Sequence, residues 1–120
     1  MLDKSTINMF RAMQPPGKQS LLVELIDLFL EHSPPRLTDA LKAFDDRDVQ
    51  KLKYSVHTLK GSSQNLGAVD VGEICKEIET YIPNEDWNSI EVKLQLLRST
   101  FTTSCDELRE LKVKELQGNK

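Results

Sequence analysis

Long hydrophobic runs are absent from this sequence of 120 residues. Its most apolar stretch, residues 21–30, is interrupted by Glu24 and Asp27, so it is unsuited to crossing a membrane. The N-terminus also lacks the order of basic and then apolar residues that marks a secretory signal peptide. These absences predict a cytoplasmic protein that spans no membrane.

Basic charge and cysteine are also scarce. There are 16 Lys and Arg against 19 Asp and Glu, which gives a formal net charge of −3 and disfavours nucleic-acid binding. The two cysteines, Cys75 and Cys105, each fall on an apolar helical stripe. We therefore expect buried free thiols, rather than a disulfide or metal ligands, in a reducing compartment.

Strand patterns are missing too, because no segment alternates strictly between apolar and polar residues. Apolar residues instead recur every three or four positions, which indicates helices. A short first helix is expected from Asp3 to about Met13, ended by Pro15-Pro16-Gly17.

A pair of prolines divides the next apolar stripe. Ser33, Pro34 and Pro35 separate its two parts, which consist of Leu22, Leu25, Ile26, Phe29 and Leu30 and then of Leu37, Leu41 and Phe44. Serine can cap a helix and proline suits a first turn. We therefore expect a kink at this point, or a restart capped by Ser33.

Three further helices are expected. The first covers about residues 48–66, with Asp48 as its N-cap and Gly67 in the left-handed conformation at its end. The second starts at about Asp70 and is closed by Pro83. The last covers about residues 86–116 and has the most regular stripe, a heptad made by Ile90, Leu94, Leu97, Phe101, Ser104, Leu108 and Leu111.

Four long amphipathic helices joined by short loops predict an all-α fold. We expect an antiparallel four-helix bundle with an additional short N-terminal helix, formed by residues 1–120 as a single domain. The heptad of the last helix has a second interpretation, because the same spacing forms the seam of a coiled-coil dimer. We expect a monomer.

One histidine stands out by its position and its neighbours. At about 100° per residue, His57 lies off the apolar stripe of its helix, and Lys53, Lys60, Gly61 and Gln64 lie within about 60° of it. A neutral imidazole is a good nucleophile near pH 7. An exposed histidine is also commonly an ordinary surface residue, and the residue pattern alone leaves both interpretations open.

The neighbours of His57 suit a phosphoryl group carried on its imidazole. Lys60 could form a charge-assisted hydrogen bond to it, and Lys53 adds positive potential. Glycine inside an exposed helix costs about 1 kcal/mol relative to alanine. The absence of a side chain at Gly61 would leave space for another protein to approach the ring, which would explain a glycine here despite that cost. Gln64 is within reach as a neutral donor.

The segment around His57 resembles the signature of histidine-containing phosphotransfer (HPt) domains, H-x-L-K-G-S-S-x-x-x-G-A. All fixed positions match in His57-Thr58-Leu59-Lys60-Gly61-Ser62-Ser63-Gln64-Asn65-Leu66-Gly67-Ala68. Cys75 and Glu79 stand where the family often has a cysteine and an acidic or amide residue.

The resemblance implies a helical bundle with an exposed phospho-accepting histidine, His57. Lys60 would support the phosphoryl group and Gly61 would give clearance. Glu79 or Gln64 would orient the imidazole through its other nitrogen. Ser62 and Ser63 match the motif but are assigned structural roles, because Ser63 lies on the core side and Ser62 points away from His57.

The resemblance also implies partners: receiver domains of response regulators and of hybrid sensor histidine kinases. The function expected is relay of a phosphoryl group between receiver aspartates in a two-component phosphorelay, either as a free-standing carrier or as a domain of a hybrid kinase. No glycine-rich nucleotide motif is present, so we expect a phosphocarrier rather than an enzyme. No cofactor is expected in this chain, and a divalent metal is expected in the receiver.

Other classes fit the sequence less well. A histidine-kinase dimerisation helix would have an acidic residue directly after the histidine, but Thr58 follows His57. A metal-binding bundle needs Glu-x-x-His pairs, which His32 and His57 do not form. A non-catalytic helical module that docks to a receiver or kinase stays as the alternative. It would be expected to lose His57 or Lys60, and both are present.

Overall fold

The computed structural model describes residues 2–13 and 20–118, and nearly all of them are helical. The helices are α1 (Lys4–Ala12), α2 (Leu21–Asp45), α3 (Val49–Leu66), α4 (Val69–Tyr81) and α5 (Trp87–Gly118). Among the described residues, an isolated antiparallel bridge joins Leu2 to Ala68. The all-α prediction is confirmed.

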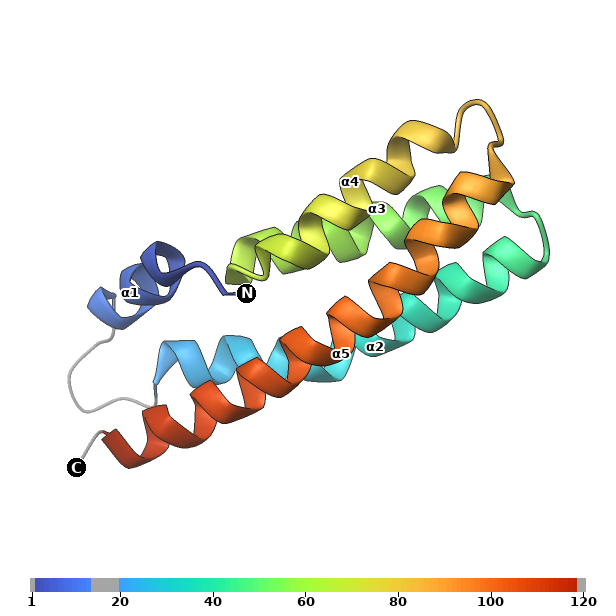
Figure 1. Cartoon of the computed structure of the whole chain (residues 1–120). Helices are drawn as coiled ribbons and strands as arrows, with labels where there is room; N and C mark the ends of the chain where they lie inside the picture. The colour runs from blue at the N-terminus through green and yellow to red at the C-terminus, as the bar shows by residue number, and fades with distance from the viewer. Residues whose placement is uncertain (1, 14–19, 119–120) are drawn as a thin grey trace.

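Helices α2 to α5 form an elongated antiparallel bundle (Figure 1). Each packs against the next in sequence, and α5 closes the bundle by packing against α2. The short α1 lies across one end, in contact with α2 and α3. The molecule measures 51 × 21 × 20 Å. This is the predicted four-helix bundle with an additional N-terminal helix.

The heptad stripe of α5 faces the inside of this bundle. Ile90, Leu97 and Leu108 are fully buried, and Leu94, Phe101 and Ser104 are nearly so. Burying a large apolar side chain contributes about 1.5–3 kcal/mol, so these residues stabilise the fold of one chain. The alternative of a coiled-coil dimer seam is therefore wrong, because the stripe is already covered by α2 and α4.

Helix α2 continues through Pro34 and Pro35, so the expected restart at Ser33 is wrong. Ser33 is buried within the helix instead of capping a new one. Proline has a fixed φ that is compatible with a helix, and its cost is the loss of backbone hydrogen bonds. Residues on both sides, such as Ile26 and Ala40, are buried in the same core. Their packing holds the two halves in one helix.

Side-chain and glycine caps define the ends of α3. The Asp48 carboxylate accepts a hydrogen bond from the Lys51 amide at 3.1 Å, as expected of an N-cap. Gly67 has φ +88°, the predicted left-handed conformation. Helix α1 ends at Ala12, and the predicted terminator Pro15-Pro16-Gly17 lies outside the described residues.

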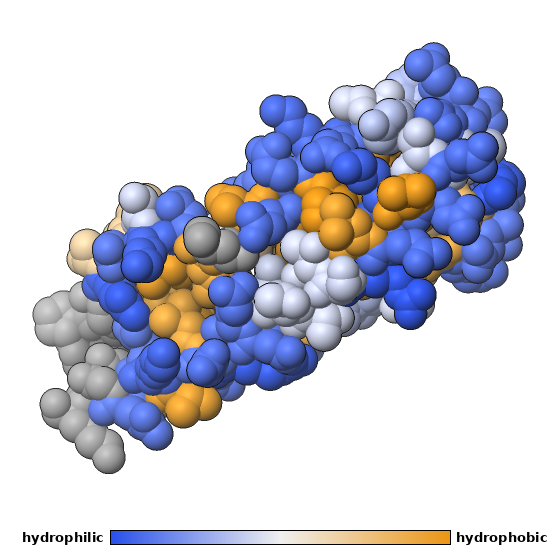
Figure 2. Space-filling view, viewed as in Figure 1, coloured by the Kyte–Doolittle hydropathy of each residue, from blue (hydrophilic) through white to orange (hydrophobic). Residues whose placement is uncertain are grey.

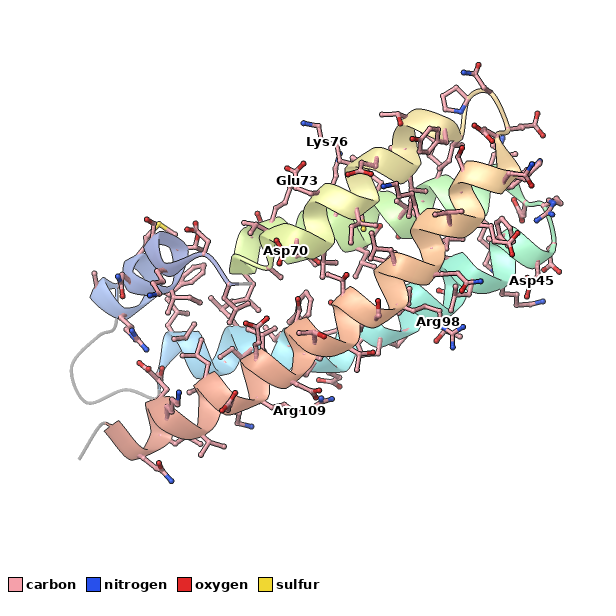
Figure 3. All side chains as sticks on the ribbon, in the orientation of Figure 1. Asp45, Asp70, Glu73, Lys76, Arg98 and Arg109 are labelled. Atoms are coloured by element: carbon pink, nitrogen blue, oxygen red, sulfur yellow. The ribbon has the colours of Figure 1, made fainter. Side chains whose placement is uncertain are left out.

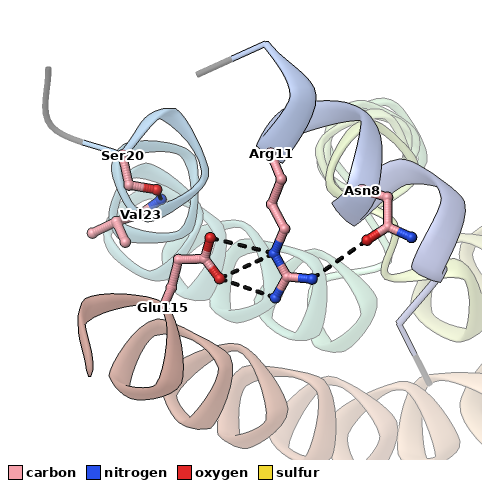
Figure 4. Close-up of polar contacts among 5 residues, drawn as sticks. All are labelled: Asn8, Arg11, Ser20, Val23 and Glu115. Atoms are coloured by element: carbon pink, nitrogen blue, oxygen red, sulfur yellow. Dashed lines mark hydrogen bonds and ion pairs between the residues drawn. The ribbon is translucent and has the colours of Figure 1, made fainter. Parts of the chain in front are cut away.

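Long side chains join α1 to the far end of α5. The Arg11 guanidinium contacts the Glu115 carboxylate, with a shortest distance of 2.9 Å, and also bonds Asn8 (Figure 4). Exposed ion pairs of this kind contribute at most about 1 kcal/mol. Hydrophobic residues are visible between hydrophilic ones at this end of the molecule (Figure 2). Ile7 of α1 is buried in the core and Phe10 packs against it, so the placement of α1 rests on apolar contact as well as on charge.

Cys75 and Cys105 are free and buried, as predicted. None of the helices in the described part of the chain combines the length and apolarity needed to cross a membrane.

Candidate functional site

His57 lies midway along α3, on the outside of the bundle. The ring side chain is 68% exposed. The neighbouring Val56 and Leu59 are fully buried and fix the rotation of the helix. The core contacts of α3 thus present the imidazole to solvent, as the helical wheel predicted.

A carboxylate from the adjacent helix holds the ring of His57. Nδ1 lies 3.1 Å from Oε2 of Glu79, which is on α4. The other oxygen of the same carboxylate, Oε1, lies 2.6 Å from Nζ of Lys60. One carboxylate therefore contacts both the imidazole and the lysine. Other charged residues of α4, such as Glu73 and Lys76, point away from the bundle (Figure 3).

Contacts with Lys60 and His57 keep Glu79 ionised. Partial burial raises the pKa of the Glu79 carboxyl, but hydrogen bonds and charge from Lys60 and His57 outweigh it, so the pKa is lowered overall. An ionised carboxylate can only accept hydrogen bonds. The proton of a neutral His57 must therefore sit on Nδ1, which leaves the lone pair on Nε2.

Gly61 leaves an open space beside His57. A Cβ atom built on Gly61 meets no atom within 4 Å, apart from its chain neighbours and its own helix backbone. Packing within the chain therefore gives no reason for a glycine here. This geometry agrees with the predicted role in clearance.

The other predicted site residues lie on α3, but their predicted roles toward His57 depend on contacts beyond those described above. Gln64 packs against α4, where a Cβ on Gly72 would lie 2.7 Å from its Cγ. Its hydrogen bond to His57 stays a prediction. Lys53 is exposed one turn before His57, and its electrostatic role also stays a prediction. Ser63 is fully buried and Ser62 is exposed, in agreement with the wheel.

A comparison with protein families decides where this chain belongs. The model of the Hpt domain matches residues 24–113, well over half of the chain. The chain belongs to the Hpt domain family. The match includes all of α3, α4 and the motif around His57.

Curated relatives of this Hpt domain are named for phosphorelays. It is 26% identical over 81 residues to Multistep phosphorelay regulator 1 of Schizosaccharomyces pombe, covering 68% of this chain and 28% of that protein. It is 27% identical over 75 residues to the Phosphorelay intermediate protein rdeA of Dictyostelium discoideum, covering 62% and 30%. The chain thus spans less than a third of the length of each.

Solved structures share the fold of this Hpt domain. Histidine-containing phosphotransfer protein B from Pseudomonas aeruginosa PAO1 matches with a TM-score of 0.85 at 22% identity, covering 94% of this chain and 95% of that one. The maize protein ZmHP2 matches with a TM-score of 0.84 at 19% identity, covering 99% and 87%. At these identities the likenesses show a shared fold, and the family match is what places the chain among Hpt domains.

The sequence did not reveal a groove between α1, α2 and α3 of the Hpt domain. Its volume is about 530 Å³, and it is lined by Met9, Phe10, Leu25, Leu28, Phe29, His32, Ser33, Ser62, Asn65 and Leu66. The exposed Leu28 and Met9 make it apolar. Helical periodicity assigned several of these residues to the core, but only the placement of α1 leaves a groove there.

The contact between Lys60 and Glu79 was also missed. The pairs His57–Glu79 and Gln64–Gly72 are each equidistant in sequence from Ala68, where the chain turns between α3 and α4. In an antiparallel helical hairpin, residues equidistant from the turn lie opposite one another. The position of the turn therefore places Glu79 opposite His57, and because Lys60 is one turn from His57 on α3, the same signal could have placed Lys60 near Glu79.

The described residues also include two histidines relevant to the metal alternative. His32 on α2 lies 3.9 Å from the carboxylate of the neighbouring Glu31. Within residues 2–13 and 20–118, no group of three or more His, Cys, Asp or Glu is placed to hold a metal ion.

Proposed function

We propose that His57 accepts a phosphoryl group from an aspartyl phosphate of a receiver domain and later donates it to the aspartate of another receiver. The observation that carries this proposal is the exposed imidazole whose Nδ1 is held by Glu79, at 3.1 Å. This contact directs Nε2, with its lone pair, away from α4. An oriented nucleophile lowers the barrier to transfer because less orientational freedom is lost on reaction.

The transfer balances without moving a proton. The Nε2 lone pair attacks phosphorus, the phosphorus–oxygen bond to the aspartate breaks, and the aspartate leaves as a carboxylate with the bonding electron pair. The ring then carries the phosphoryl group on Nε2 and the original proton on Nδ1, and is formally cationic. In the reverse direction the ring leaves as neutral imidazole, with the same proton on Nδ1 held by Glu79.

The surface beside His57 suits an approaching receiver. Gly61 leaves open space for the partner backbone. The apolar groove between α1, α2 and α3 reaches α3 at Ser62 and Asn65, within two turns and three turns of His57 along the helix. Transient exchange of a phosphoryl group calls for a modest interface rather than an obligate one. Receivers of response regulators and of hybrid sensor histidine kinases are the proposed partners.

The chain itself supplies position and charge in this proposal. It acts as a monomeric, cytoplasmic phosphocarrier without a nucleotide site of its own, and it needs no cofactor in its own fold. A divalent metal ion bound by the receiver would neutralise charge on the transferring phosphoryl group. Lys60, with Lys53 one turn from His57, adds positive charge on the carrier side.

The test is replacement of His57. We expect His57→Gln to abolish phosphate uptake from a panel of receiver domains labelled with radioactive acetyl phosphate. Bound label on the natural protein should be labile to acid and stable to alkali, as expected of a phosphoramidate. Because His57 is exposed, far-ultraviolet circular dichroism should show an unchanged helix content in the variant.

Arg98→Gln is the control, since Arg98 is exposed on α5, the helix that packs against α2 and α4. It should retain uptake. Uptake that survives in His57→Gln would contradict the proposal. Receiver binding without phosphate uptake by the natural protein would favour the non-catalytic docking module.

A further inference from the structure

Lys60 faces two anions in the proposed cycle. In the unphosphorylated chain its ammonium lies 2.6 Å from Oε1 of Glu79. Its side chain is only 22% exposed, so this contact is shielded from water more than an ordinary surface ion pair. Yet the same lysine lies one turn after His57 on α3, and both side chains contact the Glu79 carboxylate, so Lys60 is also close to a phosphoryl group carried on the ring. One ammonium group cannot bind both the Glu79 carboxylate and the phosphoryl group equally well at the same time.

Phosphorylation of His57 changes which cation neutralises the Glu79 carboxylate. In the form that attacks phosphorus the ring is neutral, and Lys60 is the cation beside the carboxylate. After transfer to Nε2, with the Nδ1 proton retained, the ring is cationic and lies 3.1 Å from Oε2 of Glu79. The carboxylate then has a positive partner in the ring itself. Lys60 can leave Glu79 at that moment without exposing an uncompensated, partly buried charge.

Resting on the proposed function, we propose that Glu79 exchanges counter-ions during the cycle: Lys60 before phosphorylation, and the phosphorylated imidazole of His57 after it. Lys60 breaks its ion pair with Glu79 and binds the phosphoryl group when the ring becomes cationic. It pairs with Glu79 again when the phosphoryl group leaves. Glu79 is thus a positioning residue that competes with the phosphoryl group for Lys60.

The exchange would make the carrier reversible. A lysine bound only to the phosphoryl group would favour the phosphorylated state and hold the phosphoryl group back from the next receiver. A carboxylate that can take the lysine back stabilises the unphosphorylated state as well. A phosphocarrier needs both states close in free energy, because it must accept and donate with the same site.

The direct test is nuclear magnetic resonance on the natural protein. The hydrogen-bond scalar coupling between ¹⁵Nζ of Lys60 and the carboxylate carbon of Glu79 should be present before phosphorylation. It should be lost when His57 is phosphorylated chemically with phosphoramidate at neutral pH. Retention of the coupling after phosphorylation, or its absence before, overturns the proposal.

A double-mutant cycle tests the competition separately. Lys60→Gln should lower the equilibrium ratio of phosphorylated carrier to phosphorylated receiver, and this loss should be larger in the Glu79→Gln background by at least about twofold. Additive effects overturn the competition. Glu77→Gln is the matched control, because Glu77 is also on α4 but pairs with Lys93 of α5 at 2.5 Å. In the Glu77→Gln background, Lys60→Gln should lower the equilibrium ratio by the same factor as it does in the natural protein.

The two proposals fail in different ways. If no receiver phosphorylates the natural protein, the proposed function fails, while chemical phosphorylation still tests the counter-ion exchange. If receivers phosphorylate it and the Lys60–Glu79 coupling persists, the function stands and the exchange is wrong. The ¹⁵N shifts of the His57 ring in Glu79→Gln add a signature of position, because the preference for a proton on Nδ1 should weaken without the carboxylate.

Discussion

At the scale of single residues, Gly61 lowers the stability of the fold but leaves the space that phosphotransfer is proposed to require. The helix would be more stable with a side chain there, because glycine costs about 1 kcal/mol relative to alanine and a Cβ on Gly61 meets no other part of the chain. We expect Gly61→Ala to raise the free energy of unfolding by about 0.5–1 kcal/mol. Urea denaturation measures this, and a loss of stability would show that the open space is needed within the chain.

A larger side chain at Gly61 should have the opposite effect on transfer. Gly61→Leu is expected to slow phosphate uptake from a receiver at least about tenfold, because misplacing the reacting atoms by about 1 Å can cost a hundredfold. Single-turnover transfer from a phosphorylated receiver measures the rate. Chemical phosphorylation with phosphoramidate is the control and should be little affected, since the small donor needs no clearance. Unchanged transfer from the receiver would refute the role of Gly61.

The sequence predicted His57, Lys60 and Gly61 because all three lie on one helix, where spacing alone determines the face. It gave Glu79 only through the resemblance, and it gave no sign that Glu79 also contacts Lys60. That contact joins two helices, so it depends on how α3 and α4 pair. The roles of Lys53 and Gln64, which also lie on α3, stay predictions.

At the scale of elements, the end of α3 positions both α4 and the N-terminal segment. Gly67 has φ +88°, and a Cβ there would lie 3.2 Å from Cβ of Thr6 and 3.3 Å from the carbonyl oxygen of Asp3. The Asp3 amide also donates to the Gly67 carbonyl at 2.7 Å. The turn between α3 and α4 and the start of α1 therefore share one tightly packed site.

We expect Gly67→Ala to destabilise the chain by about 1–2 kcal/mol, because an L-residue in the left-handed region is strained and the added methyl group crowds α1. Thermal or urea unfolding measures the loss. The comparison with Gly61→Ala is sharp, since the same substitution in or at the end of one helix should change stability in opposite directions. Equal effects at the two glycines would contradict this account of the turn.

In helix α2, a local sequence signal did not predict where the helix ends. Pro34 and Pro35 are a local signal for interruption, and that signal was overruled by burial on both sides of the pair. Asp48 and Gly67, by contrast, marked the ends of α3 correctly, because a cap acts through its own neighbouring amides and carbonyls. Local signals were reliable where the interaction itself is local.

At the scale of the whole molecule, the core limits stability at high pH. Burial, with the nearby charge of Glu79, raises the pKa of the Cys75 thiol from 9.0 to about 12. The unfolded chain releases this proton near pH 9, while the folded chain retains it to about pH 12. Since the unfolded state then binds fewer protons, the free energy of unfolding falls as pH rises above 9.

We expect the free energy of unfolding to drop by about 1 kcal/mol between pH 8 and pH 10 because of Cys75 alone. Urea unfolding of the natural protein and of Cys75→Ala at both values isolates this part, because other groups titrate alike in the two proteins. The natural protein should show the steeper fall. Parallel pH profiles would mean that Cys75 is not held neutral by the fold.

The sequence by itself determined the helical bundle, the caps of α3, the exposed His57 and the family. Each of these follows from periodicity, from contacts within a few residues, or from a contiguous motif. Only the tertiary structure decided that α2 passes through its prolines, that the α5 heptad faces its own bundle, and that α1 leaves an apolar groove. It alone brought Lys60 and His57 to the same carboxylate of Glu79, because the register between helices is set by packing across the whole core.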